Sequence, residues 1–213
     1  MGIYNAATIT TIKNWINGVP NTTIRNILKL GVIDNLNSAD AVVGPALTAE
    51  HGAGAIGTAF APRTYRYNLN GDIVTEIHVD LTGLAVVGTA AKDAIGLAAG
   101  GVAYIGRYVT ATYGIVYRIE MLCVEAPGQG TATITQDIDL GADDEGDIVY
   151  DGGVDDIIVN TGTLVAGEVV VNNVPALTAD DYIYLIEGDT AATTGVYNAG
   201  QYIIRFYGHA LIT

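Results

Sequence analysis

The chain has few of the residues that carry most enzymatic chemistry. It contains one cysteine, one serine and three histidines. The lone Cys123 excludes an internal disulfide framework, and its apolar neighbours indicate a buried, inert thiol. The lone Ser38 lacks a Gly-x-Ser-x-Gly context, and the histidines lack the spacing of metal ligands. A phosphate-binding loop of the Gly-x-x-x-x-Gly-Lys-Ser/Thr type is also missing. We therefore predict that the protein is not an enzyme.

Basic residues are scarce too. Nine Lys and Arg stand against 23 Asp and Glu, which gives a formal net charge of −14. Binding of nucleic acid phosphates requires clustered Lys and Arg, so we predict no nucleic-acid partner. Only 15% of the residues are charged, which is low for a monomer that must cover its whole surface. This composition favours a homo-oligomer, in which part of the surface is buried between subunits.

Long uninterrupted apolar runs are absent from the sequence. The most apolar stretch, residues 84–105, is broken by four glycines and carries Lys92 and Asp93, so it is a poor candidate for a membrane span. The N-terminus shows no charged head followed by an apolar run, so no secretion signal is recognised. We expect a protein that is made in the cytoplasm, stays soluble and has no membrane partner.

Charge divides the chain into two parts. Residues 64–213 hold 20 of the 23 acidic residues but five of the nine basic ones, whereas residues 1–63 are close to neutral. The second part also holds 12 of the 13 tyrosines and nearly all the alternation of apolar and polar residues. We predict an extended N-terminal arm over residues 1–63 and a folded body over residues 64–213.

The arm has little regular pattern. Residues 21–31 predict a short helix, with Asn21 as the N-cap, an apolar face, and Gly31 in the left-handed position after the last turn. Residues 34–62 are rich in Ala, Gly and Pro and cannot bury enough surface to fold alone. They form either a flexible linker or an extended segment that a neighbour orders.

The body reads as all-β. About eight strand-like segments follow one another without helical periodicity, which predicts an antiparallel β-sandwich of jelly-roll type. The last, residues 201–207, is apolar on both faces and suits a sandwich interior or a subunit contact. In the longest, over residues 113–125, one face is predicted to hold Tyr113, Ile115, Tyr117, Ile119, Met121 and Cys123.

A hairpin is predicted at Asn70 and Gly71. A two-residue loop there would pair Tyr67 with Val74 and mix the two faces of the strands. A three-residue loop that ends in a Gly71 bulge pairs Tyr67 with Ile73 and keeps apolar residues opposite apolar ones. The pattern therefore predicts the three-residue loop.

An acidic run is the strongest candidate for a metal site. Nine acidic residues fall between positions 137 and 156, and carboxylate oxygens at short loop spacing suit Ca²⁺. The spacing departs from an EF-hand, because Gly141 occupies the third ligand position. The alternative is a set of solvated loop carboxylates, and no other cofactor is predicted. The predicted calcium ligands are Asp137, Asp139, Asp143, Asp144 and Asp147.

Tyrosines on strand faces allow a second kind of site. Aromatic rings on a sheet can stack on sugars, as they do in jelly-roll carbohydrate-binding modules. Packing in a core or an interface explains the alternation of these tyrosines with apolar neighbours more simply. The tyrosines in question are Tyr65, Tyr67, Tyr113, Tyr117, Tyr182, Tyr184 and Tyr202.

Three blocks of the body resemble structural proteins common in tailed phages of marine bacteria. They read YRYNLNGDIVTEI at 65–77, GIVYRIEMLCVEAP at 114–127 and TGVYNAGQYIIRFYG at 194–208. The resemblance implies a non-enzymatic virion protein, most plausibly a head decoration (cement) protein on the capsid exterior, with a jelly-roll body. From it we expect a homo-oligomer, a trimer, that binds the major capsid protein.

The arm is the part expected to dock on the capsid. Apolar anchors beside a few cations are what a segment needs to become ordered on a partner. The residues that fit are Lys13, Trp15, Ile24, Arg25, Ile27 and Leu28. The alternative function is a carbohydrate- or receptor-binding module of a phage fibre or tail.

Overall fold

The structure is a computed structural model. The chain divides into two units, residues 1–48 and residues 49–213, and the description below concerns the second unit alone. The arm helix predicted over residues 21–31 and all the predicted docking residues lie outside the described part of the chain. The described residues are 50–69, 71–87, 90–129, 134–188 and 194–209.

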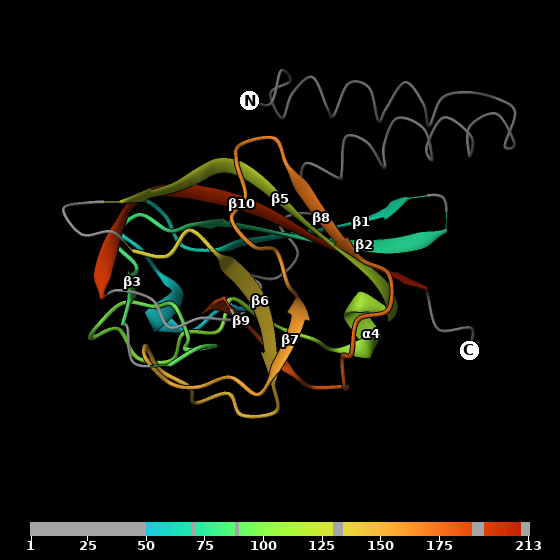
Figure 1. Ribbon diagram of the computed structural model, residues 1–213. Coiled ribbons are helices and arrows are strands. Elements are labelled where there is room, and N and C mark those ends of the chain that lie inside the picture. Colours follow the sequence, from blue (N-terminus) through green and yellow to red (C-terminus); the bar gives the residue numbers. More distant parts are fainter. Residues whose placement is uncertain (1–49, 70, 88–89, 130–133, 189–193, 210–213) are drawn as a thin grey trace, which may run out of the picture. The chain divides into compact units, whose positions relative to one another are not determined.

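A large antiparallel sheet forms one layer of the body (Figure 1). The sequence supplies it from distant segments, because the last strand, β10 (Gly195–His209), lies between β2 (Asp72–Asp80) and β5 (Ile115–Gln129). A short strand, β3 (Ala85–Val86), also pairs with β10. The main order of the sheet is β1 (Arg63–Leu69), β2 (Asp72–Asp80), β10 (Gly195–His209), β5 (Ile115–Gln129) and β8 (Val169–Asn172).

A smaller antiparallel sheet forms the second layer, below the first in Figure 1. Its order is β4 (Gly106–Arg107), β9 (Tyr182–Glu187), β6 (Ile138–Asp143) and β7 (Asp156–Val159). Among the described residues the helical elements are short: a 3-10 turn, η2 (Ala53–Ala55), and a single turn, α4 (Thr110–Tyr113). The prediction of an all-β sandwich is confirmed.

The core lies between the two sheets. Alternation puts every second residue of the central strands β2 and β10 into it, because successive side chains of a strand point to opposite faces. Cys123 is fully buried there, as predicted for an inert thiol. The large sheet contributes Ile77, Val79, Ile119, Met121, Cys123, Tyr202, Ile204 and Phe206, and the small sheet contributes Ile138, Leu140, Ile183 and Leu185.

The hairpin between β1 and β2 differs from its prediction. Tyr67 is opposite Val74 and Leu69 is opposite Asp72, which leaves two residues in the loop, so the predicted three-residue loop is wrong. The physical reason is that β1 is an edge strand, mostly exposed or half-buried on both faces. Matching apolar residues across this pair therefore gains little, and both tyrosines of β1 lie on the solvent side of the sheet.

A bulge in β5 overturns a second prediction. Tyr207 is opposite Arg118 and Gly208 is opposite Val116, so Tyr117 is the extra residue between them. Tyr117 therefore leaves the core face that it was predicted to share with Ile119. Its ring stacks on His209 at 4.4 Å between centroids, and its hydroxyl donates to Asp72 Oδ2 at 2.7 Å.

Residues 50–62, which the sequence assigned to the arm, contact the body. The Gly54 amide donates to the Val102 carbonyl, and the Gly54 carbonyl accepts from the Leu97 amide. Ala55 belongs to the core, and the Glu50 carboxylate forms two hydrogen bonds with the Arg66 guanidinium, at 2.7 and 2.6 Å. Backbone hydrogen bonds thus hold this segment against the body, although its weak apolar pattern did not predict such a contact.

Candidate functional site

The solvent side of the large sheet, here called the outer face, is the candidate functional site. It is formed by side chains of β1, β2, β10 and β5 that point away from the core. One cross-strand row runs from Tyr65 through Glu76 and Arg205 to Glu120, each residue opposite the next. The outer face comprises Tyr65, Tyr67, Glu76, His78, Arg118, Glu120, Arg205 and Tyr207.

Arg205 occupies the centre of this face, between two carboxylates. Its Nε donates to Glu76 Oε2 at 2.6 Å, and its Nη1 lies 3.9 Å from Glu120 Oε2. His78 Nε2 lies 2.5 Å from Glu76 Oε1, so both oxygens of that carboxylate have partners. The side chains of Glu76 and Glu120 are 15% and 13% exposed, so this is a half-buried ionic network and its geometry is fixed.

Aromatic rings lie on both sides of this ionic network and contact its charged groups. The Tyr207 hydroxyl donates to Glu120 Oε2 at 2.8 Å, and the Arg118 guanidinium lies 5.2 Å from the Tyr207 ring centroid. Arg118 also forms an ion pair with Glu120. On the other side, the Tyr65 ring lies 5.0 Å from the His78 ring. The outer face therefore presents a continuous layer of interlocked rings and charges.

The network keeps the Glu76 carboxylate charged. Burial alone would raise the pKa of Glu76, but the hydrogen bonds from His78 and Arg205 outweigh it and hold that pKa below its usual value. Burial and the bond to Glu120 raise the pKa of Tyr207 to about 12. Two arginines thus face two carboxylates, and the outer face is nearly neutral on a chain whose net charge is −14.

The predicted calcium ligands do not share one environment. Asp139 and Asp143 are buried on β6, whereas Asp144 and Asp147 are exposed. Asp143 Oδ1 accepts from the Glu145 amide and Oδ2 from the Asp155 amide, and Asp139 Oδ1 accepts from the Thr161 amide. For these two residues the alternative of solvated loop carboxylates is wrong, because they cap main-chain groups of neighbouring loops.

Calcium binding by the acidic run remains a prediction. Within the described part of the chain, no three His, Cys, Asp or Glu side chains are placed to hold a metal ion. If Ca²⁺ does bind, a chelator should lower the melting temperature by the linkage effect, which amounts to about 2.7 kcal/mol when the ion is at 100 times its Kd. Differential scanning calorimetry with and without chelator measures this shift. Identical thermograms in the two conditions would refute the calcium prediction.

Five of the seven tyrosines considered as sugar platforms fall into two groups. Tyr113, Tyr184 and Tyr202 are fully buried, so packing is their role, as the simpler interpretation stated. Tyr65 and Tyr67 lie on the outer face, with Tyr67 43% exposed. Sequence reasoning missed the ion pairs beside these two rings. The sequence signal for these ion pairs was the alternation of charged residues on the polar faces of three segments. That signal identifies a site only when the order of the strands is known.

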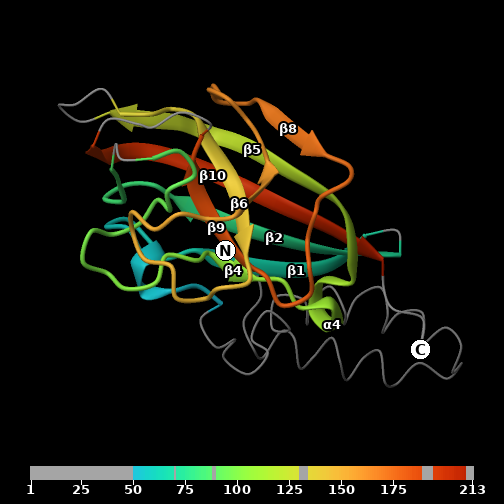
Figure 2. The same cartoon turned by 60° about the horizontal axis from the view of Figure 1, so that its bottom comes forward.

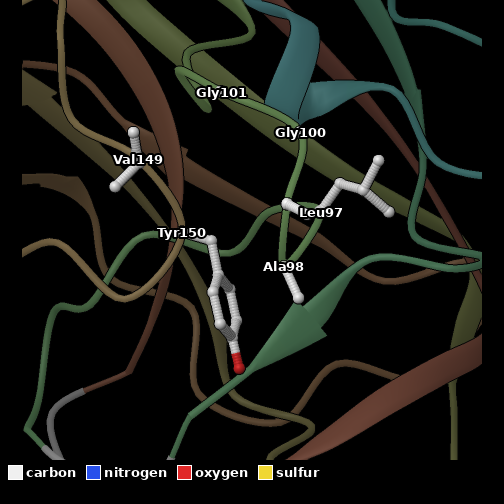
Figure 3. Close-up of a pocket in the computed structure, with 7 residues that line it drawn as sticks. Leu97, Ala98, Gly100, Gly101, Val149 and Tyr150 are labelled. Atoms are coloured by element: carbon white, nitrogen blue, oxygen red, sulfur yellow. The ribbon is translucent and has the colours of Figure 1, made fainter.

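One shallow pocket of about 230 Å³ lies away from the outer face (Figure 3). It is lined by the loop of residues 97–101 with Val149 and Tyr150, and the Tyr150 ring extends beside Ala98 in Figure 3. The Tyr150 hydroxyl donates to the Val86 carbonyl at 3.2 Å. The lining is otherwise apolar or main chain, so the pocket suits a small apolar group.

Comparison with known proteins gives no identification. The chain matches no protein family model, and a search of curated proteins and of solved structures finds no significant match. Of the described helices, none has the length and apolar character needed to cross a bilayer.

Proposed function

We propose that the protein is a non-enzymatic structural component of a tailed-phage virion: a decoration protein on the outside of the head, with a jelly-roll body. One observation carries this proposal. The three blocks that resemble phage structural proteins form β1 and β2, β5, and β10, which are neighbours in the large sheet. Their outward side chains build the outer face, so the resemblance converges on one surface.

The physical character of the outer face supports a contact role. Its charges are paired with each other and held between rings, so a partner can cover the face without ordering long side chains first. Its near neutrality also matters, because a strongly acidic protein is repelled by other acidic surfaces. A decoration protein gains from such faces through repetition, since several weak contacts act together at high effective concentration.

The arm completes the proposal. Trp15, Ile24, Ile27 and Leu28 would anchor it on the major capsid protein, with Lys13 and Arg25 as flanking cations. A body that joins other copies through one surface, and an arm that binds the shell, would together tie neighbouring capsomers.

Electron microscopy of virions labelled with an antibody against the chain tests this function. Label distributed over the head is the expected result. Label at the tail tip would reject the decoration role and support a receptor-binding one. Particles that lack the protein altogether would reject both virion roles.

A second candidate is a carbohydrate- or receptor-binding module of a fibre or tail. The observation in its favour is the pair Tyr65 and Tyr67 on the outer face. The Tyr67 hydroxyl is within 3.5 Å of Glu76 Oε2, so a ring for stacking adjoins a carboxylate that can accept from sugar hydroxyls. The labelling experiment separates this candidate from the first, because it predicts label on the tail.

A further inference from the structure

Exposed apolar side chains gather at one end of the large sheet. Four exposed valines lie within ten residues along the chain, on β8 and its flanks. Val169 and Val171 of β8 are 48% and 39% exposed, and Val174 is 86% exposed. The valine edge, as it is called below, consists of Val165, Val169, Val171 and Val174.

The valine edge is almost free of charge. From residue 157 to residue 179 the single charged residue is Glu168, although an acidic run precedes this segment and Asp180 and Asp181 follow it. Glu168 Oε2 accepts from the Val165 amide at 2.9 Å, so its carboxylate is engaged in its own turn. This segment is therefore a nearly uncharged stretch beside a strand of the large sheet.

Apolar side chains continue from the valine edge across the sheet. Val169 is opposite Leu122 of β5, and Leu122 is opposite Ile203 of β10. All three point to the solvent side, next to the ion pairs of the outer face. An apolar strip thus crosses three strands and ends at β8, which single scattered surface residues would not produce.

β8 is also an open strand edge. It is the last strand of the large sheet, and no described strand lies beyond it (Figure 2). The backbone groups of a strand point alternately to its two sides. Glu168, the residue before β8, is hydrogen-bonded to β5, because its carbonyl accepts from the Cys123 amide. Hydrogen-bonded positions alternate along an antiparallel pair, so the next such position on β8 is Val170, opposite Met121. The N–H and C=O groups of Val169 and Val171 therefore point away from β5.

Soluble proteins usually protect such an edge with Lys, Pro or a bulge, and the four residues of β8, Val-Val-Val-Asn, include neither Lys nor Pro. An uncharged, valine-rich edge whose outward backbone groups have no partner strand among the described residues is a template for another strand. The partner must offer an extended backbone edge and apolar side chains, and β8 of a second copy of this chain offers both without a charged residue.

We propose that the valine edge binds the valine edge of a second copy of this chain. The two β8 strands pair antiparallel about a twofold axis perpendicular to the sheet, with Val169 opposite Val171 of the second copy. This register keeps outward side chains on one face and pairs the outward-directed backbone groups with each other. In this contact the two paired strands carry no charged side chain.

The contact goes beyond the proposed virion role and does not depend on it. A twofold contact gives a dimer or an even-numbered assembly, whereas the sequence led us to expect a trimer. The mass of the assembly in solution therefore distinguishes the two, and the position of the protein on a virion does not affect the answer.

Sedimentation velocity and light scattering of the full chain at about 10 µM test the proposal. We expect an even-numbered assembly for the unaltered protein. Val171→Pro removes the N–H that points away from β5, and an edge strand tolerates proline at such a position, so the body should stay folded while the assembly dissociates. Val169→Lys with Val171→Lys should also give monomers, because it places like charges opposite each other.

Val196→Lys is the matched control, because Val196 is 53% exposed but lies at the other end of β10, outside the valine edge. It should leave the assembly unchanged. Thermal unfolding by circular dichroism checks each variant, and Val171→Thr replaces any that loses its cooperative transition. A monomeric unaltered chain, an odd-numbered assembly that the edge variants do not alter, or equal dissociation by Val196→Lys would each overturn the proposal.

Discussion

The body is expected to unfold cooperatively as the pH rises from about 10 to about 12, because several tyrosines in its core cannot ionise in place. Burial raises the pKa of Tyr113 to about 12, and burial raises the pKa values of Tyr197 and Tyr202 further. All three are at most 1% exposed. In the unfolded chain each would lose its proton near pH 10.

The sign follows from the protons bound in each state. Below pH 10 both states hold the tyrosine protons, so the contribution to stability is fully present. Above pH 10 the unfolded chain releases them and the folded chain keeps them, so the free energy of unfolding falls as the pH rises. Each such tyrosine lowers the free energy of unfolding by about 1.4 kcal/mol per pH unit, and the three together lower it by about 4 kcal/mol per pH unit.

Parallel titrations of tyrosinate absorbance and far-ultraviolet circular dichroism check this expectation. Part of the absorbance change should coincide with the loss of the β signal. Tyr202→Phe removes one core hydroxyl and should make the decline in stability with pH less steep. Tyr67→Phe should have a smaller effect, because that ring is 43% exposed and burial raises its pKa less. Complete tyrosine ionisation with an intact β signal would contradict the prediction.

Replacing Gly208 by alanine should lower the free energy of unfolding by about 3 kcal/mol, at the upper end of the range for overpacking a core. A Cβ at this position would lie 2.0 Å from the Tyr113 carbonyl oxygen, and a backbone atom cannot move aside as a flexible side chain can. Gly208 is also the residue opposite the β5 bulge, so the substitution should disturb the outward orientation of Tyr117.

Gly153→Ala is the matched control, because a Cβ there meets nothing within 4 Å. This substitution should be close to neutral, since it mainly reduces the freedom of the unfolded chain. Urea denaturation of the two variants gives the comparison. Equal midpoints would show that the strand can shift at Gly208, and the close approach would then not constrain the fold.

Alternation was enough to predict the fold class and much of the core. Ile119, Met121 and Cys123 were assigned to one face from their spacing, and all three are fully buried. Alternation could not predict the bulge at Tyr117, because a bulge depends on a distant strand that supplies Gly208. It also placed the hairpin register one residue away from the observed one, because matching apolar residues gains little on an exposed edge strand.

The candidate site was harder to predict than the core. Glu76, Arg205 and Glu120 come from three segments far apart in the sequence and meet only because β10 lies between β2 and β5. Charge pattern also could not separate Asp139 and Asp143 from their exposed neighbours. A carboxylate that caps a buried loop and one that faces water have the same spacing in a sequence.

The division of the chain into two units also separates its fluorophores. Trp15, the only tryptophan, belongs to residues 1–48, whereas 12 of the 13 tyrosines lie in residues 64–213. Tryptophan emission therefore originates in the first unit alone, and tyrosine emission comes mainly from the sandwich. Anything that binds the first unit can be followed by a shift in colour in the native chain, without a dye or an added label.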